Sequence, residues 1–245
     1  MPETTLSQRP VSPWTFRAGL LVLVCFALLY TCTSAAHMLL VKHAIGFEAY
    51  LGDGPGLPQH LLLTLQLTKA VLLLGVLAVA LQRRGLDWAT LGLRPTTRKW
   101  LMLAVLVAVA GLLIRLMLAR WMSVAVPDWA TFMRSPYGSV DSGMMVSIAL
   151  GFCTVLLTPF AEEVFFRGFL FTWMTGHRPV WLAMLVSSLI FGAMHIIPPQ
   201  AISAALMALA LCALYWFSNS LWPPILAHVI GNGIAYFSML ANSAS

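Results

Sequence analysis

The feature that most constrains this chain is a series of long apolar segments with almost no charged residues. Seven such segments can be read from the sequence, at 18–41, 61–82, 100–118, 143–175, 180–197, 200–218 and 222–240. Most approach the length of about 20 residues that a helix needs to cross about 30 Å of hydrocarbon. Only 9% of the 245 residues are charged, against about 25% in soluble proteins. The sequence therefore predicts an all-α, polytopic transmembrane helical bundle with about seven spans.

The distribution of basic residues gives an expected orientation. Five of them lie in the loop at 83–99, namely Arg83, Arg84, Arg94, Arg98 and Lys99. Because cytoplasmic loops carry an excess of Lys and Arg, this loop and the amino terminus are expected to face the cytoplasm. We expect a multi-pass integral protein of a bacterial-type inner membrane.

The net charge of +6 does not indicate nucleic-acid binding. The basic residues lie mostly in loops between apolar segments, where they act as topology determinants. No basic cluster is interleaved with aromatic residues in a way that would follow a phosphate backbone. The partner expected from these apolar segments is the lipid bilayer.

We predict three regions along the chain: a polar N-terminal tail at 1–17, an N-terminal transmembrane region at 18–142 and a third region at 143–240, to which the motifs below assign the catalytic role. The segment 143–175 is too long for one straight span. Pro159 within it removes a backbone donor and favours a kink. We expect a broken or re-entrant helix here, which would give eight segments, with Glu162 and Glu163 near the break.

Placing a charged side chain within a membrane span costs free energy, so each such residue is a candidate functional residue. Glu163 and Arg167 are four residues apart, so they lie on one helical face and can form an ion pair. Glu162 points about 100° away around the helix, where no local partner is evident.

Two later segments carry further polar residues at helical spacing. "FGAMH" places His195 four residues after Phe191, and "HVIGN" places His228 four residues before Asn232. Small residues beside both motifs allow helices to approach closely. If these helices meet, a carboxylate, two imidazoles and an amide converge in one pocket.

This set of side chains suits hydrolysis. A carboxylate shielded from bulk water can act as the base for a water molecule, and a histidine can hold that water. A second histidine and an amide can donate hydrogen bonds to an oxyanion. Glu162, His195 and His228 would also suit a catalytic zinc with an open position. There is no HExxH motif, and spacing does not decide between the metal-free and zinc versions.

Other polar residues in the apolar segments are not grouped with further polar residues in this way. We interpret Lys69 as a packing or cavity residue, and Arg115 as a side chain that extends toward the membrane interface. The four cysteines form no CxxC pair and are interpreted as small buried hydrophobic residues.

The motifs "EEVFFR" at 162–167, "FGAMH" at 191–195 and "HVIGN" at 228–232 resemble the EExxxR, FxxxH and HxxxN motifs of the CPBP family of intramembrane proteases. This family, also called Abi, includes the type II CAAX prenyl endopeptidases and bacteriocin-processing enzymes. The resemblance covers about 143–240, and "LGLRP" before the third span is also typical of the family.

The resemblance implies a role for each motif residue. Glu162 would activate water together with His195, while His228 and Asn232 would hold the oxyanion. Glu163 and Arg167 would order the site. Because family members have been described both as metalloproteases and as glutamate proteases, the resemblance leaves the zinc question open.

We therefore expect an intramembrane endopeptidase of membrane-associated proteins or peptides. Two alternatives stay open: a catalytically silent scaffold or immunity protein of the same family, and an ion- or proton-coupled transporter. One conflict is also left. His195 lies late in its segment and His228 early in its own, so full-length spans would place the two histidines at different depths.

Overall fold

The computed structural model describes residues 12–46, 58–125, 143–195 and 198–243. Every regular element in these residues is helical, which confirms the predicted all-α class over the described part of the chain. The elements are α1 Phe16–Ile45, α3 Gln59–Arg84, the 3-10 turn η2 Trp88–Leu91, α4 Arg98–Ala125, α6 Met144–Phe152, the π-helical η3 Cys153–Leu157, α7 Thr158–Glu163, the π-helical η4 Val164–Phe171, α8 Thr172–Thr175, α9 Val180–Ala193, α10 Pro198–Ser218 and α11 Trp222–Ser243.

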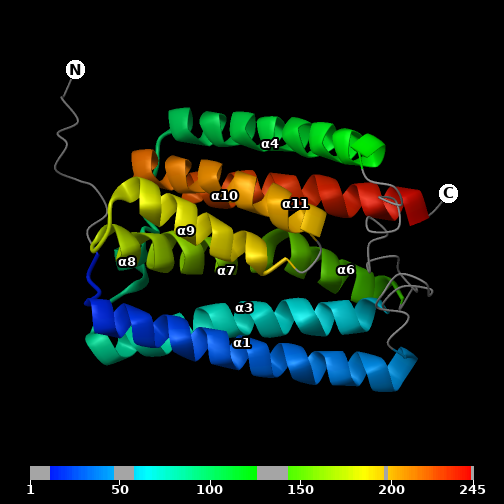
Figure 1. Ribbon diagram of the computed structural model, residues 1–245, viewed down its shortest axis with the longest axis horizontal. Helices are drawn as coiled ribbons and strands as arrows, with labels where there is room; N and C mark the ends of the chain where they lie inside the picture. The colour runs from blue at the N-terminus through cyan, green and yellow to red at the C-terminus, as the bar shows by residue number, and fades with distance from the viewer. Residues whose placement is uncertain (1–11, 47–57, 126–142, 196–197, 244–245) are drawn as a thin grey trace.

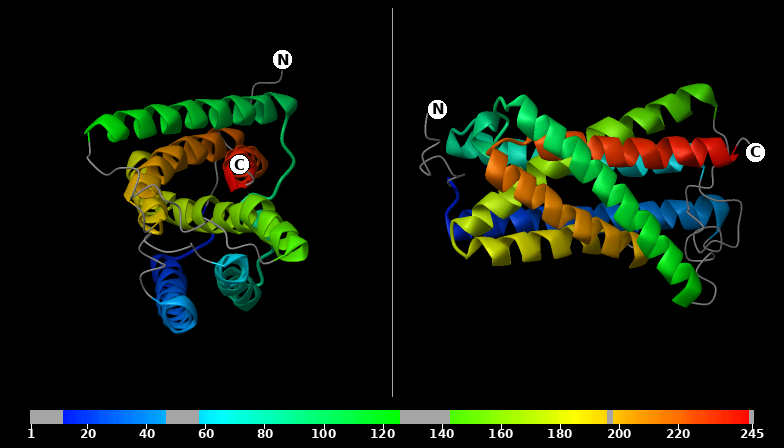
Figure 2. Two further views of the ribbon diagram at one scale, coloured as in Figure 1. Left: turned by 90° about the vertical axis from the view of Figure 1, so that its right-hand side faces the viewer. Right: turned by 90° about the horizontal axis from the view of Figure 1, so that it is seen from above.

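The helices lie along one long direction and form successive layers (Figure 1). α1 and α3 lie side by side at one edge, followed by the segment from α6 to α8 with α9, and then by α10 and α11. α4 covers the opposite edge and crosses α11 obliquely (Figure 2). The segment from α6 to α8 is therefore enclosed between α3 on one side and α10 and α11 on the other.

Five helices are long and apolar enough to cross a membrane by length and composition: α1, α3, α4, the run 144–175 and α10. Several large apolar side chains of α4 are exposed, including Met102 at 69% and Met117 at 72%, which suits contact with lipid. The chain is thus a multi-pass integral membrane protein. The predicted count of about seven spans is not confirmed, because five helices within the described residues meet these criteria.

Three predictions from the sequence stay predictions. The polar tail at 1–17 lies outside the described residues over positions 1–11. The division of the chain into three regions is not tested by the arrangement of the helices. The bacterial-type inner membrane and the cytoplasmic amino terminus also stay predictions.

The fourth apolar segment is one continuous helical run over 144–175, so the expected break at Pro159 does not occur. Instead, two π-helical turns flank α7. The N–H of Thr158 bonds to the carbonyl of Cys153, five residues earlier. Proline in a regular helix clashes with the carbonyl four residues before it, and the wider turn accommodates Pro159 without a break. Glu162 and Glu163 are the last residues of α7.

α9 is shorter than the sequence pattern predicted. It has 14 residues, so its length is about 21 Å, less than the hydrocarbon thickness of about 30 Å. The helix ends before His195, which places that histidine part-way along the bundle. This short helix, rather than a broken one, removes the conflict over the depths of His195 and His228.

The loop containing "LGLRP" packs directly against the fourth segment. Leu91 is fully buried, and its carbonyl oxygen would lie 2.7 Å from a Cβ at Gly168. Gly92 has a φ of +98°, and a Cβ there would lie 2.6 Å from the Tyr215 hydroxyl. Tyr215 in turn donates to the Leu91 carbonyl at 3.2 Å. The glycines therefore allow the loop to dock on the helix that carries Glu162.

We expect Gly92→Ala to destabilise the protein more than Gly85→Ala. Both glycines have positive φ, but a Cβ at Gly85 meets nothing within 4 Å. Left-handed backbone should cost about 1 kcal/mol at Gly85, whereas strain plus overpacking should cost about 3 kcal/mol at Gly92. Apparent melting temperatures in detergent would measure the difference, and equal losses would contradict the docking contact.

Candidate active site

The site is built from charged side chains buried at the centre of the bundle. Glu162 is 3% exposed, and Glu163 and Arg167 are completely buried. All three lie on the continuous run from α7 into η4. Because isolated buried charges are costly, each of these groups requires a partner from a neighbouring element.

Glu163 and Arg167 form the ion pair expected from their spacing. Arg167 Nη1 donates to Glu163 Oε1 at 2.8 Å, and Nη2 donates to the carbonyl oxygen of Ala208 on α10 at 3.3 Å. The guanidinium also lies over the Phe191 ring, 4.7 Å from its centroid. Arg167 thereby joins three elements of the bundle.

Glu162 points to a different side of the helix, as its position in the sequence indicated. Its Oε1 lies 2.7 Å from Nζ of Lys69 on α3. Its Oε2 lies 3.6 Å from Nε2 of His228 on α11. The two adjacent glutamates therefore contact different cations.

His228 lies between the two glutamates. Its Nδ1 is 2.8 Å from Glu163 Oε1, the same oxygen that accepts from Arg167. This bond assigns the Nδ1 proton, because the carboxylate oxygen is an acceptor. The other ring nitrogen then faces Glu162.

Phe191 explains why an aromatic residue stands four positions before His195. Its ring lies 5.2 Å from the ring of His195 and 5.8 Å from that of His228. The Phe191 carbonyl accepts from His195 Nδ1 at 3.1 Å. His195 is thus held at the end of α9 with its Nε2 as the basic nitrogen when the ring is neutral.

Asn232 does not contact the other motif residues through a described hydrogen bond. Its Nδ2 donates to the carbonyl oxygen of Thr154 at 3.0 Å, within the π-helical turn η3. A π turn leaves carbonyls displaced from their regular pairing, which gives the amide an acceptor on the helix surface. The second N–H of the amide group is not fixed by this bond.

The small residues beside the motifs differ in how closely a neighbouring helix approaches them. At Gly192, an added Cβ would lie 2.7 Å from the Ala201 carbonyl oxygen, so α9 and α10 approach closely there. Ala227 is fully buried and packs in a cluster with Ala104 and Ala108 of α4. A Cβ at Gly231 would meet nothing within 4 Å, so that glycine does not mark a close approach.

Lys69 is the residue that the sequence interpretation left out of the site. The sequence does contain an indication of this role. Glu162 and Glu163 are the acidic residues of the seven apolar segments, and Arg167 is expected to pair with one of them. A lysine within an apolar span needs a counter-charge. Lys69 and Arg115 are the remaining basic residues of these segments. With Arg115 assigned to the membrane interface, Lys69 is the partner left for Glu162.

Glu162, His195 and His228, the ligands considered for a zinc-dependent mechanism, do not fit a metal centre in this arrangement. The described residues contain no group of three His, Cys, Asp or Glu side chains placed to hold a metal ion. Glu162 faces the Lys69 ammonium, which competes with a cation for the same oxygen. His228 Nδ1 is bonded to Glu163, which leaves Nε2 as the ring nitrogen that could bind a metal. We therefore derive no step through zinc.

A family model described as type II CAAX prenyl endopeptidase Rce1-like matches residues 144–234. This match supports a CPBP-family membrane protease domain over residues 144–234. A search of curated proteins and a search of solved structures each gave no match.

The matched segment of this CPBP domain contains the six candidate residues of the three motifs. Lys69 lies outside it, on α3. The contacts of Glu162 therefore join the matched segment to the N-terminal half of the chain.

We expect Arg167→Met to destabilise the protein strongly, because it leaves the Glu163 carboxylate buried without its cation. Removing one partner of a buried pair typically costs about 3–5 kcal/mol. The double variant Glu163→Gln with Arg167→Met should be less destabilised than Arg167→Met alone. Detergent melting curves of the variants would test this, and purely additive losses would contradict the pairing.

Proposed function

We propose that this protein is an intramembrane endopeptidase in which Glu162 activates the attacking water. The observation that carries the proposal is the position of Glu162: it is almost fully buried within the matched segment, beside His228 and a lysine ammonium. A carboxylate in such a place is a reasonable general base because few competing waters surround it.

The geometry suggests which oxygen of Glu162 takes the proton. Oε1 is bound by Lys69, whereas Oε2 faces His228 across 3.6 Å. At this separation the two atoms do not form a direct hydrogen bond, so Oε2 is left able to accept from a water molecule. We assign the attacking water to the neighbourhood of Oε2, with His195 Nε2 as a second acceptor that orients it.

His228 and Asn232 are the proposed oxyanion donors. The His228 ring is held by the contact between its Nδ1 and Glu163, which directs the Nε2 side of the ring toward the tetrahedral intermediate. Asn232 is anchored to Thr154 through one N–H and can offer the other. Loss of one such donor typically lowers kcat by about 10²- to 10³-fold.

The proposed reaction balances without an additional reactant. The water oxygen bonds to the scissile carbonyl carbon as one water proton moves to Glu162 Oε2. The carbon–nitrogen bond then breaks, and this proton passes to the leaving amine. The products are a carboxylic acid and an amine, and Glu162 returns to its carboxylate form.

The substrate proposed is a membrane-associated protein or peptide. Five apolar helices place the enzyme within the bilayer, and the residues of the site lie at the centre of the bundle. A prenyl group on the substrate is not required by any contact described. The matched family is described as prenyl endopeptidases, and that specificity is not carried over to this chain.

The test is cleavage of a membrane-peptide library by purified protein in detergent. We expect wild type to cleave and Glu162→Gln to lose cleavage while staying folded, because an amide cannot accept the water proton. Asp87→Asn is the matched control. It makes the same chemical change in a loop, where Asp87 caps η2 by accepting from Thr90, and it should retain activity.

A strong chelator provides the second arm of this test. Cleavage that persists with chelator supports a glutamate mechanism, whereas loss with chelator would replace it by a metal-dependent one. If folded wild type cleaves no peptide, the silent scaffold interpretation is favoured over the protease.

A further inference from the structure

We propose that Lys69, on α3 and outside the matched segment, is a positioning residue that fixes the reactive orientation of Glu162. The inference rests on the proposed function, since it assigns a role toward the same base. Its basis is the 2.7 Å contact between Lys69 Nζ and Glu162 Oε1.

The contact is well shielded from solvent. The side chain of Lys69 is 17% exposed and that of Glu162 is 4% exposed. Ion pairs at protein surfaces contribute little, but a shielded pair is hard to break because separation leaves a charge uncompensated. Lys69 is therefore able to hold one carboxylate oxygen and so determine where the other oxygen points.

A second polar contact sets the register between the same two helices. Thr158 Oγ1 donates to Gln66 Oε1 at 3.1 Å, and both groups are buried. Gln66 and Lys69 are three residues apart on α3, while Thr158 and Glu162 are four residues apart on α7, so each pair occupies one helical face. Two polar contacts one turn apart resist sliding of α3 along α7.

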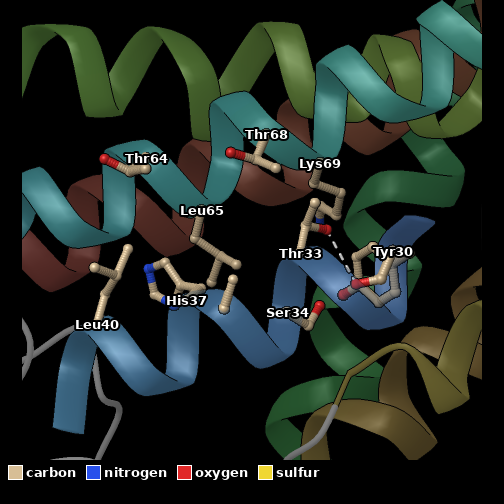
Figure 3. A pocket seen from close by; sticks show the side chains of 10 residues that line it. Tyr30, Thr33, Ser34, His37, Leu40, Thr64, Leu65, Thr68 and Lys69 are labelled. Atoms are coloured by element: carbon tan, nitrogen blue, oxygen red, sulfur yellow. Dashed lines mark hydrogen bonds between the residues drawn. The ribbon is translucent and has the colours of Figure 1, made fainter. Parts of the chain in front are cut away.

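The surroundings of Lys69 also give room for its side chain. Lys69 lines a cavity of about 200 Å³ between α1 and α3. Figure 3 shows Lys69 and Thr68 on α3 facing Thr33 and Tyr30 on α1 across this cavity. A larger guanidinium could extend into this space and still reach Glu162, so arginine should replace lysine here better than any neutral residue.

The cation also complements the histidine on the opposite side of Glu162. Lys69 contacts Oε1 from α3, and His228 approaches Oε2 from α11. With Lys69 in place, Oε2 is the oxygen directed toward the proposed water. Without it, the carboxylate would be free to rotate toward His228, and the base would lose its alignment with the water and the scissile carbonyl.

The first experiment compares cleavage by wild type, Lys69→Met, Lys69→Arg and Thr68→Ala with one substrate from the library. We expect Lys69→Met to lower kcat by about 10²-fold, the typical effect of a misplaced catalytic group, with KM changed less than threefold, which is about 0.6 kcal/mol. Lys69→Arg should recover most of the kcat. Thr68→Ala, which changes a neighbour lining the same cavity, should behave as wild type.

The second experiment measures the ion pair without relying on activity. Melting temperatures are compared for Lys69→Met in the wild-type and Glu162→Gln backgrounds. If Lys69 and Glu162 form an ion pair, Lys69→Met should clearly lower the melting temperature in the wild-type background. The decrease should be much smaller in the Glu162→Gln background, where no carboxylate is left uncompensated. Equal losses in both backgrounds would overturn the proposed pairing.

The outcomes separate this inference from the proposed function. If wild type cleaves and Glu162→Gln does not, but Lys69→Met keeps the wild-type kcat, the positioning role is wrong and the protease assignment stands. A decrease that Lys69→Arg fails to recover, or that Thr68→Ala reproduces, would also overturn it. If Glu162→Gln still cleaves, the proposed function itself fails.

Discussion

Two adjacent carboxylates buried at the centre of a membrane bundle are the constraint on which the rest of this structure depends. Neighbouring residues of a helix point about 100° apart, and Glu162 and Glu163 accordingly pair with different Lys and Arg side chains. Glu163 is paired with Arg167 on its own helix, and Glu162 is paired with Lys69 from α3. His228 contacts Glu163 and approaches Glu162. Burying this pair therefore requires α3 and α11 to pack on opposite sides of α7.

The surrounding packing follows from holding these groups in place. Phe191 contacts both site histidines and the Arg167 guanidinium, which keeps apolar surface against the charged network. Gly168 allows the loop around Leu91 to dock on the turn after Arg167. The π turn before Pro159 keeps the helix continuous, so Glu162 stays on a rigid element. A base held in this way has little freedom to leave its reactive position.

Much of the CPBP-type site could be predicted from the sequence because its strongest contacts are local. The Glu163–Arg167 pair follows from a four-residue spacing, and the contact between Phe191 and His195 follows from the same spacing across the end of α9. The role of Lys69 could not be derived in this way, since 93 positions separate it from Glu162 in the printed sequence. Asn232 was grouped with His228 by spacing, yet its amide bonds to Thr154, a contact that depends on where η3 exposes a carbonyl.

The sequence by itself determined the membrane environment, the helical class and the order of the three motifs, because hydrophobic length and residue spacing are local properties of the chain. It did not determine the continuity of the helix through Pro159, the shortness of α9 or the partner of Glu162. These were decided by the tertiary structure, because a widened turn, a helix end and a counter-charge each depend on which segments pack together. The pairing of Lys69 with Glu162 is the clearest case: each residue carries an unmatched charge in its own span, and only the packing of α3 on α7 brings the two charges into contact.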